Sequence, residues 1–209
     1  MDIDFDDVGR FVGLGHTFES HAPDPVDWPV LWIEPDEAMV ASGETVEITP
    51  EVEAIGVGPE LTAVVGEELW RPDAAEAADA IAGFTVSNDV SAGGRWPGNP
   101  SETVLSRGYK MLPTFRPVLT EAVEITVEEA SDLRIEAFVD GEQVADASTA
   151  GTRWSIGEMV REVATVMPLS PGDLVALGEP HCEGRIEDQG EVTCRIEGIG
   201  ELTNPIERV

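Results

Sequence analysis

Short runs of β-branched and aliphatic residues recur along the whole chain and constrain its fold more than any other feature of the sequence. They favour strands, because residues branched at Cβ pack well on a pleated surface and the runs are too short for helices. One run precedes Asp140-Gly141, a pair suited to the positive φ of a tight hairpin turn, which Gln143-Val144-Ala145 follows. The pattern predicts a β-rich α+β fold. The expected strands are Val30–Ile33, Thr45–Ile48, Leu61–Val65, Phe84–Val86, Val118–Leu119, Leu133–Val139 and Val192–Ile196.

Two segments carry the signals of helices. Ser155 and Glu158 have the spacing of a capping box, in which each side chain binds a free backbone amide of the other residue. Apolar residues then fall on one face, and Pro168 ends the helix. A second helix begins near Asp73, with Glu76 three residues later. We expect both helices to be packing elements.

The charge of the chain excludes several classes of partner. Its 209 residues include 42 Asp or Glu and 12 Lys or Arg, which gives a formal net charge of −30. Nucleic acids and anionic membrane surfaces bind clustered basic residues, so we expect neither as a partner. Because 42% of the residues are hydrophobic, the chain has the composition of a folded protein and not of a disordered one.

We expect a single domain over residues 1–209, because neither a Pro/Gly-rich linker nor an internal repeat divides the sequence. The stretch from Met1 to Asp7 is acidic where a signal peptide is basic and then apolar, and no run approaches the ~20 apolar residues of a membrane span. The sequence therefore favours a cytoplasmic protein. Cys182 and Cys194 are interpreted as small buried hydrophobic residues, with a pair facing across a hairpin as the alternative.

Four segments match the motifs of one known family, in the same order. They are Glu60–Gly66 (E-L-T-A-V-V-G), Gly83–Ala92 (G-F-T-V-S-N-D-V-S-A), Leu169–Gly178 (L-S-P-G-D-L-V-A-L-G) and Ile196–Pro205 (I-E-G-I-G-E-L-T-N-P). These segments resemble the fumarylacetoacetate hydrolase family. The resemblance covers the chain from about Val12 onward, so residues 1–11 are interpreted as an N-terminal extension of a fumarylacetoacetate hydrolase-like domain.

The resemblance implies a fumarylacetoacetate hydrolase C-terminal-domain-like β-roll, a homodimer, and a pocket that binds a small 2-oxo acid beside Mg²⁺ or Mn²⁺. Family members hydrolyse C–C bonds in acylpyruvates or fumarylacetoacetate, and others isomerise, hydrate, dehydrate or decarboxylate related oxo acids. The shared chemistry is coherent, because a hard cation that chelates the oxo and carboxylate oxygens stabilises enolate charge as it develops.

The metal ligands implied by the resemblance are incomplete in this chain. The family's E-x-E motif falls on Gly58-Pro59-Glu60, and its downstream aspartate falls on Asp89. Glu60 and Asp89 are therefore the expected ligands, while Gly58 lacks a side chain. Water or another carboxylate must fill the lost ligand position. Glu51 and Glu53 lie upstream, but they can also be interpreted as part of a solvated strand.

The family also carries a catalytic histidine with an acid three residues later. His21-Ala22-Pro23-Asp24 supplies that pattern if two residues are inserted, whereas the ungapped alignment places Glu19 at the histidine position. We take His21 as the general base and Asp24 as the acid that orients it, because a neutral imidazole is suited to proton abstraction near pH 7. A surface histidine with an acidic neighbour remains an alternative, and His16 is a weaker candidate.

Two further segments are implied to bind substrate. The family's K-S-F-D-x-F-x-P motif is aligned with the segment that starts at Arg107 and contains Tyr109. Arginine in place of lysine can still bind a carboxylate, but it does not deprotonate. Glu179 replaces the threonine of the family's G-T-P motif. Its charge either repels an anionic substrate or replaces the missing metal ligand.

Two functions remain open from the sequence. The first is a metal-dependent hydrolase or isomerase of a small 2-oxo acid. The second is a non-catalytic paralogue that keeps the fold as a dimeric binding protein, since the chain departs from the family at Gly58, Arg107 and Glu179.

The acidic residues also suggest an adaptation to salt. Lys110 is the only lysine, against eleven arginines. This composition resembles that of salt-in halophiles such as halophilic archaea. In molar salt the Debye length falls to about 3 Å, so a surface covered with carboxylates no longer repels itself. Most acids are therefore expected to solvate the surface, and a catalytic carboxylate must be identified from its context.

Overall fold

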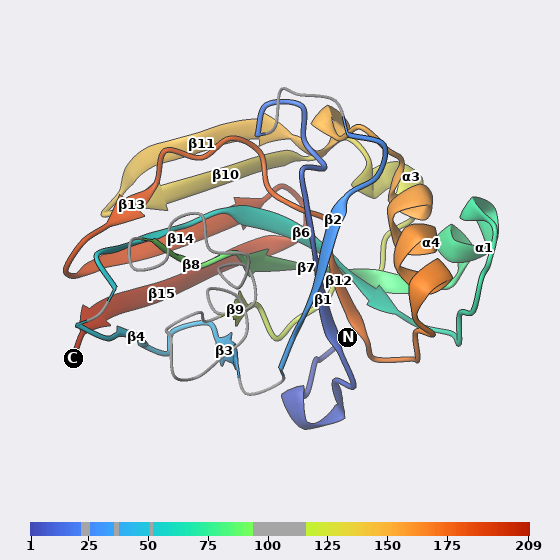
Figure 1. The fold of residues 1–209 in the computed structure, drawn as a ribbon, viewed down its shortest axis with the longest axis horizontal. Coiled ribbons are helices and arrows are strands. Elements are labelled where there is room, and N and C mark those ends of the chain that lie inside the picture. The colour runs from blue at the N-terminus through green and yellow to red at the C-terminus, as the bar shows by residue number, and fades with distance from the viewer. Residues whose placement is uncertain (22–25, 36–37, 51, 94–115) are drawn as a thin grey trace.

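The computed structural model describes residues 1–21, 26–35, 38–50, 52–93 and 116–209, and most of its strands form two curved sheets (Figure 1). The first sheet has seven strands in the order β2-β1-β12-β6-β7-β9-β3. Their bounds are β1 Phe11–Gly15, β2 Val30–Glu34, β3 Met39–Ala41, β6 Pro59–Val65, β7 Ile81–Asn88, β9 Arg116–Val118 and β12 Leu174–Ala176.

The second sheet has five strands in the order β11-β10-β14-β15-β4, and a small third sheet has the order β13-β5-β8. The bounds are β4 Val46–Ile48, β5 Ala54–Gly56, β8 Ser91–Gly93, β10 Arg134–Val139, β11 Glu142–Ser148, β13 Arg185–Ile186, β14 Gly190–Ile196 and β15 Gly200–Arg208. The larger sheets share one hydrophobic core, to which Leu61 and Phe84 of the first and Ile135 and Leu202 of the second contribute.

The predicted β-rich fold is confirmed. Each of the seven expected runs overlaps a strand, namely β2, β4, β6, β7, β9, β10 and β14, although Val118–Leu119 shares only Val118 with β9. The predicted hairpin joins β10 to β11, where Asp140 and Gly141 have φ values of 50° and 80°. The seven expected runs do not include β1, β3, β5, β8, β12, β13 and β15, and most of these strands are only two or three residues long, so their sequence signal is weak.

Both expected helices are present, and they pack against each other at one end of the molecule (Figure 1). Helix α1 is Ala74–Asp79 and helix α4 is Ile156–Val166, each with a complete capping box. At Gly157 a Cβ atom would lie 2.3 Å from the carbonyl oxygen of Ala74, so glycine permits the close contact. Within the described residues, a short helix, α3 (Val127–Ala130), and the 3-10 turns Phe5–Asp7 and Thr149–Gly151 complete the elements.

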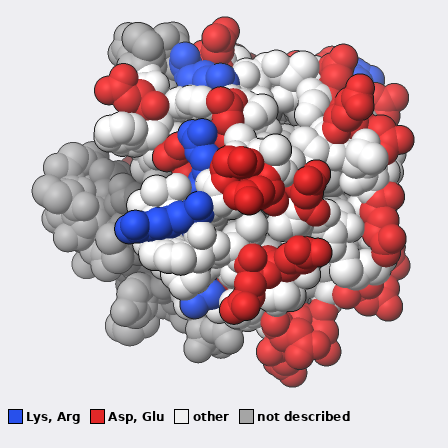
Figure 2. Space-filling model, turned by 90° about the vertical axis from the view of Figure 1, so that its right-hand side faces the viewer, with Lys and Arg blue, Asp and Glu red and all other residues white. Residues whose placement is uncertain are grey.

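Acidic side chains are spread over the face that carries α1 and α4, with basic side chains in only a few places (Figure 2). This distribution agrees with the net charge of −30. Among the described residues, no helix has the length and apolar character needed to cross a membrane.

Candidate functional site

A pocket of about 280 Å³ opens where β1, β2 and β6 lie close together. Its polar lining includes three carboxylates and two imidazoles. The lining residues are Leu14, Gly15, His16, His21, Val30, Trp32, Glu60, Asp89 and Glu179. Four residues that the sequence marked as site candidates, His21, Glu60, Asp89 and Glu179, therefore meet in one place. A larger hollow of about 540 Å³ lies elsewhere, but its titratable groups are all acids, so it offers neither a base nor a cation.

The register of β6 and β7 brings Glu60 and Asp89 together. Glu60 is opposite Ser87 in this antiparallel pair, and Asp89 follows the last residue of β7. The backbone N–H of Asp89 donates to the carbonyl oxygen of Gly58 at 2.8 Å, which extends the pairing past the strand end. Glu60 is fully buried and Asp89 is 4% exposed. Both acids are thus held by sheet hydrogen bonds, and not by a flexible loop.

Glu179 reaches the same place from the other side of β6. Strand β12 is antiparallel to β6, with Ala176 opposite Thr62, and the N–H of Leu177 donates to the carbonyl oxygen of Leu61. The chain then turns at Gly178, whose φ is 86°, so Glu179 follows beside the start of β6. Its side chain is 17% exposed.

His21 lies at the mouth of the pocket. Its Nδ1 atom is 3.5 Å from Oε1 of Glu179, and its side chain is 34% exposed. The rings of His16 and His21 are 6.1 Å apart between centroids. Asp24, the acid expected to orient His21, lies outside the described residues, as do Arg107 and Tyr109. In the described part of the chain, the acid beside His21 is Glu179.

Trp32 forms a wall of the pocket. Its indole lies over β1 at Gly13, where a Cβ atom would come within 2.3 Å of the ring. Its Nε1–H donates to Oε1 of Glu34 at 2.8 Å. Gly13 is therefore required for this contact, and the indole lines the same pocket as the carboxylates.

A buried arginine that the sequence reasoning missed holds the carboxylates in place. Arg116 on β9 is fully buried and forms ion pairs with Glu34, Glu60 and Asp89. Its Nε–H donates to both oxygens of Glu34, at 3.1 and 3.2 Å, and an Nη2 atom lies 3.4 Å from Oδ1 of Asp89. Its guanidinium also lies 5.0 Å from the ring centroid of Phe11.

Burial by itself lowers the pKa of Arg116, but the charges of Glu34, Glu60 and Asp89 raise it well above its ordinary value. The arginine is therefore always charged.

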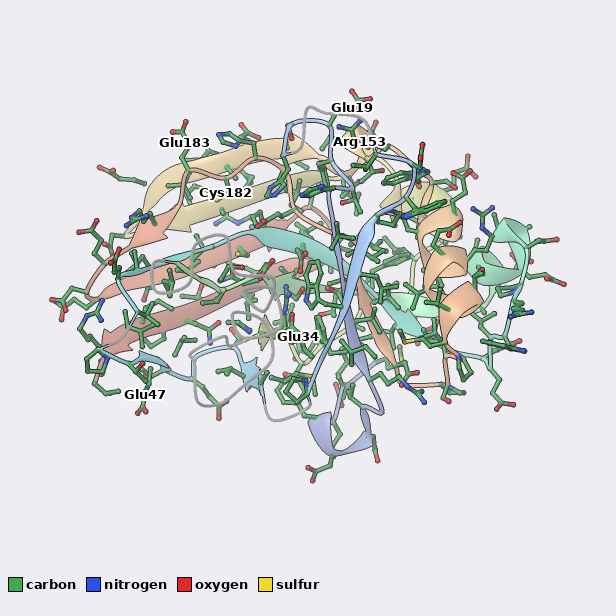
Figure 3. The ribbon with its side chains drawn as sticks, viewed as in Figure 1. Glu19, Glu34, Glu47, Arg153, Cys182 and Glu183 are labelled. Atoms are coloured by element: carbon green, nitrogen blue, oxygen red, sulfur yellow. The ribbon has the colours of Figure 1, made fainter. Side chains whose placement is uncertain are left out.

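Glu34 lies within the body of the molecule, whereas Glu19, Glu47 and Glu183 lie at its periphery (Figure 3). Among Glu34, Glu60, Asp89, Glu179 and Arg116 the formal charge is −3, which favours a bound cation.

In a shifted register of the motif alignment, Arg116 falls inside a family motif. The family pattern K-S-F-D-x-F-x-P also matches the segment from Lys110 to Pro117 without gaps, with identities at Lys110, Phe115 and Pro117. In this register Arg116 occupies the variable position between phenylalanine and proline. The register that begins at Arg107 has none of these identities, so the shifted one describes the segment better.

The donor set of the pocket fits Mg²⁺ or Mn²⁺. Hard divalent cations prefer carboxylate oxygens and retain several waters. Glu60, Asp89 and Glu179 supply such oxygens, and Glu179 fills the space that a side chain at position 58 would need. In the part of the chain that the structure describes, no three acidic, histidine or cysteine side chains already surround one point as a formed metal centre. Arg116 holds two of the carboxylates instead.

Neither cysteine has the surroundings of a reactive thiolate. Both are free thiols, and Cys194 is fully buried. Burial, with a smaller contribution from Glu179 and Glu183, raises the pKa of Cys182 to about 11, and burial raises that of Cys194 as well. A thiol with a raised pKa carries little thiolate near pH 7. Their interpretation as small, partly or fully buried residues agrees with this environment.

Comparisons with known proteins agree with the motifs. The family model described as "Fumarylacetoacetate (FAA) hydrolase C-terminal" matches residues 10–207. A curated protein of Mycobacterium tuberculosis is 32% identical over 207 residues, which span 96% of this chain and 76% of the relative.

Two solved structures share the fold. A 5-carboxymethyl-2-hydroxymuconate delta-isomerase from Mycobacterium smegmatis has a TM-score of 0.86 and 29% identity, over 97% of this chain and 80% of that one. A fumarylpyruvate hydrolase from Pseudomonas aeruginosa, in complex with Mn²⁺ and pyruvate, has a TM-score of 0.79 and 24% identity, over 97% of this chain and 91% of that one. At that identity the second likeness shows the fold alone.

Proposed function

Because this chain belongs to the fumarylacetoacetate hydrolase family, defined by its C-terminal domain, we propose that it is a divalent-metal-dependent enzyme of small 2-oxo acids, either an isomerase or a C–C hydrolase. One observation carries the proposal: Glu60, Asp89, Glu179 and His21, drawn from separate parts of the sequence, line one pocket. The family name describes a hydrolase, and the Mycobacterium smegmatis structure named above is that of an isomerase.

The roles of the residues follow from their placement. Mg²⁺ or Mn²⁺ at the carboxylates would supply a Lewis acid that polarises the oxo and carboxylate oxygens of a substrate. His21, at the pocket mouth, takes or returns the proton in an isomerisation and removes a proton from water in a hydrolysis. The Glu179 carboxylate, 3.5 Å away, stabilises the imidazolium that His21 becomes. Trp32 excludes water from one side.

The test is turnover by protein that has been stripped of metal and then reloaded with Mn²⁺, using 5-carboxymethyl-2-hydroxymuconate for isomerisation and acetylpyruvate for hydrolysis. We expect activity on one of them that EDTA removes and Mn²⁺ restores. His21→Ala should lower kcat about 10²- to 10⁴-fold, the usual contribution of a general base. The matched control is His181→Ala, because His181 is 63% exposed and lies outside the pocket lining. Equal activities of the two variants would refute the role of His21.

A second candidate function is a non-catalytic binding protein, and Arg116 is the observation that favours it. This arginine pairs with both Glu60 and Asp89, so it already neutralises part of the charge that a metal would neutralise. If the pairing has replaced the metal, the protein should bind no Mn²⁺ at millimolar concentration and turn over neither substrate. Calorimetric titration with Mn²⁺ separates the two functions.

We also propose a cytoplasmic homodimer. The support is that two large apolar side chains, Trp28 beside the edge strand β2 and Ile33 on it, are 69% and 53% exposed. Exposed apolar side chains at a sheet edge are suited to a symmetric contact with a second copy. Light scattering in molar KCl should give about twice the 22.4 kDa mass of the chain. The monomer mass, or an unchanged mass in Ile33→Glu, would contradict this interface.

A further inference from the structure

Gly58 and Glu179 compete for one volume in the pocket. A Cβ atom built on Gly58 would lie 1.1 Å from Oε2, 2.3 Å from Cδ and 3.0 Å from Cβ of Glu179. Oε2 is the atom nearest to that Cβ position. The carboxylate of Glu179 therefore occupies the space where the first atom of a side chain at position 58 would lie. Position 58 therefore cannot carry a side chain while the Glu179 carboxylate lies in this place.

The backbone on both sides of this contact is fixed. The N–H of Gly58 donates to Oδ1 of Asn88 at 3.0 Å, and its carbonyl oxygen accepts from the N–H of Asp89 at 2.8 Å. Gly178 has φ of 86°, and a Cβ there would lie 2.0 Å from Oγ1 of Thr17. The backbone at both positions is therefore closely packed, so any relief of the contact has to come from the Glu179 side chain.

We infer that Glu179 supplies, from the segment after β12, the metal-ligand carboxylate that the family motif supplies from position 58. This inference rests on the proposed function, because it concerns the same pocket. Glu179 restores the carboxylate that Gly58 lacks, so the number of acids around the site is preserved. Oε2 occupies the position-58 volume, while Oε1 lies 3.5 Å from Nδ1 of His21. The carboxylate of Glu179 thus shares the metal site with Glu60 and Asp89 and also contacts the general base, His21.

The inference predicts that the two positions can be exchanged. Four proteins form the test: the unaltered chain, Glu179→Thr, Gly58→Glu and the double variant Gly58→Glu/Glu179→Thr. The double variant restores the family pattern at both positions. Mn²⁺ affinity is measured by calorimetry, and metal-dependent thermal stabilisation is measured separately, at the lowest KCl concentration that keeps each protein folded. Neither readout depends on turnover.

We expect Glu179→Thr to weaken Mn²⁺ binding at least 10-fold. Gly58→Glu should lower the unfolding temperature, because two side chains meet in one volume. The double variant should regain an affinity within a few-fold of the unaltered chain, so the two changes are strongly non-additive. Glu183→Thr is the matched control, since Glu183 is 82% exposed in the same segment, and it should leave Mn²⁺ affinity unchanged.

The outcomes separate this inference from the proposed function. If Glu179→Thr binds Mn²⁺ as tightly as the unaltered chain, the ligand role of Glu179 is overturned while the metal site stands. The role is also overturned if only the double variant binds Mn²⁺, because position 58 would then be needed. If neither the unaltered chain nor the double variant binds Mn²⁺, the metal-dependent function itself fails. Should Gly58→Glu not fold, the other three proteins still decide.

Discussion

Arginine–carboxylate pairs occur in two regions of this molecule, and burial makes them different interactions. Beside the pocket, Arg116 is fully buried with Glu34 and Glu60. On the outer face of the five-stranded sheet, Arg134 and Asp146 pair at 2.8 Å with side chains 53% and 49% exposed. Water and salt screen the outer pair, so it adds little to stability. The inner cluster has lost its hydration, so removing one member leaves a buried charge without compensation.

The largest expected difference between the two regions comes from removing each arginine. Arg116→Met should cost about 3–5 kcal/mol in the free energy of unfolding, because Glu34, Glu60 and Asp89 lose their shared cation. Arg134→Met should change stability little. Urea unfolding in molar KCl measures both. Comparable losses would show that burial does not distinguish the two sites.

Salt provides the second test of the comparison. With a formal net charge of −30, the surface repels itself in dilute buffer, and KCl should relieve this repulsion. We expect the unfolding temperature to rise by several degrees from low to molar KCl, at roughly 2–4 °C per kcal/mol for a domain of this size. A flat or falling midpoint would contradict the halophilic interpretation.

The same experiment sharpens the contrast within the pocket. The stability difference between the unaltered chain and Arg116→Met should persist at high salt, because mobile ions do not reach a fully buried guanidinium. A difference that disappears in molar KCl would mean that solvent reaches the cluster.

The fold was predictable where local signals agree with the tertiary structure. The capping boxes at Asp73 and Ser155 and the turn at Asp140-Gly141 need only neighbouring residues, and each occurs as expected.

Two of the family motifs, Leu169–Gly178 and Ile196–Pro205, contain a residue with a structural role. Asp173 accepts from the N–H of Ser170 and pairs with Arg10. Asn204 donates to the carbonyl oxygens of Ala41 and Glu44.

The site was predictable only in part, because its decisive contacts join distant residues. Motif matches located Glu60 and Asp89, but no local pattern distinguishes the buried Glu34 from the many acids of the surface. Arg116 was missed because the motif alignment began at Arg107. The exclusion between Gly58 and Glu179 depends on the register of β6 and β12, which the sequence does not show.

A helix cap gives a smaller effect, of the local kind. Ser155 accepts from the N–H of Glu158, and its own N–H donates to the Glu158 carboxylate at 2.8 Å. Ser155→Ala should cost about 1 kcal/mol, as is typical for an N-cap. Thermal unfolding measures this loss of stability. Ser101→Ala is not used as the control, because Ser101 lies outside the described residues. Thr165→Ala, near the end of the same helix, is the better one and should cost less.

The smallest effect concerns acid, and it tests whether the charge of one surface carboxylate, Glu158, stabilises the cap of α4. Hydrogen bonds from the backbone N–H and then the hydroxyl of Ser155 lower the pKa of Glu158 from its ordinary 4.5. A carboxyl whose pKa is lower in the folded state stabilises the fold above its unfolded pKa, and this contribution is lost as the pH falls through the folded value. The unaltered chain should therefore exceed Glu158→Gln in stability at pH 6, and the difference should shrink steadily below pH 4.5. Urea unfolding of both proteins in molar KCl, from pH 6 downward, measures that difference. If it stays constant through the acid range, the cap of α4 gains nothing from the charge of Glu158, and the hydrogen bonds alone account for its stability.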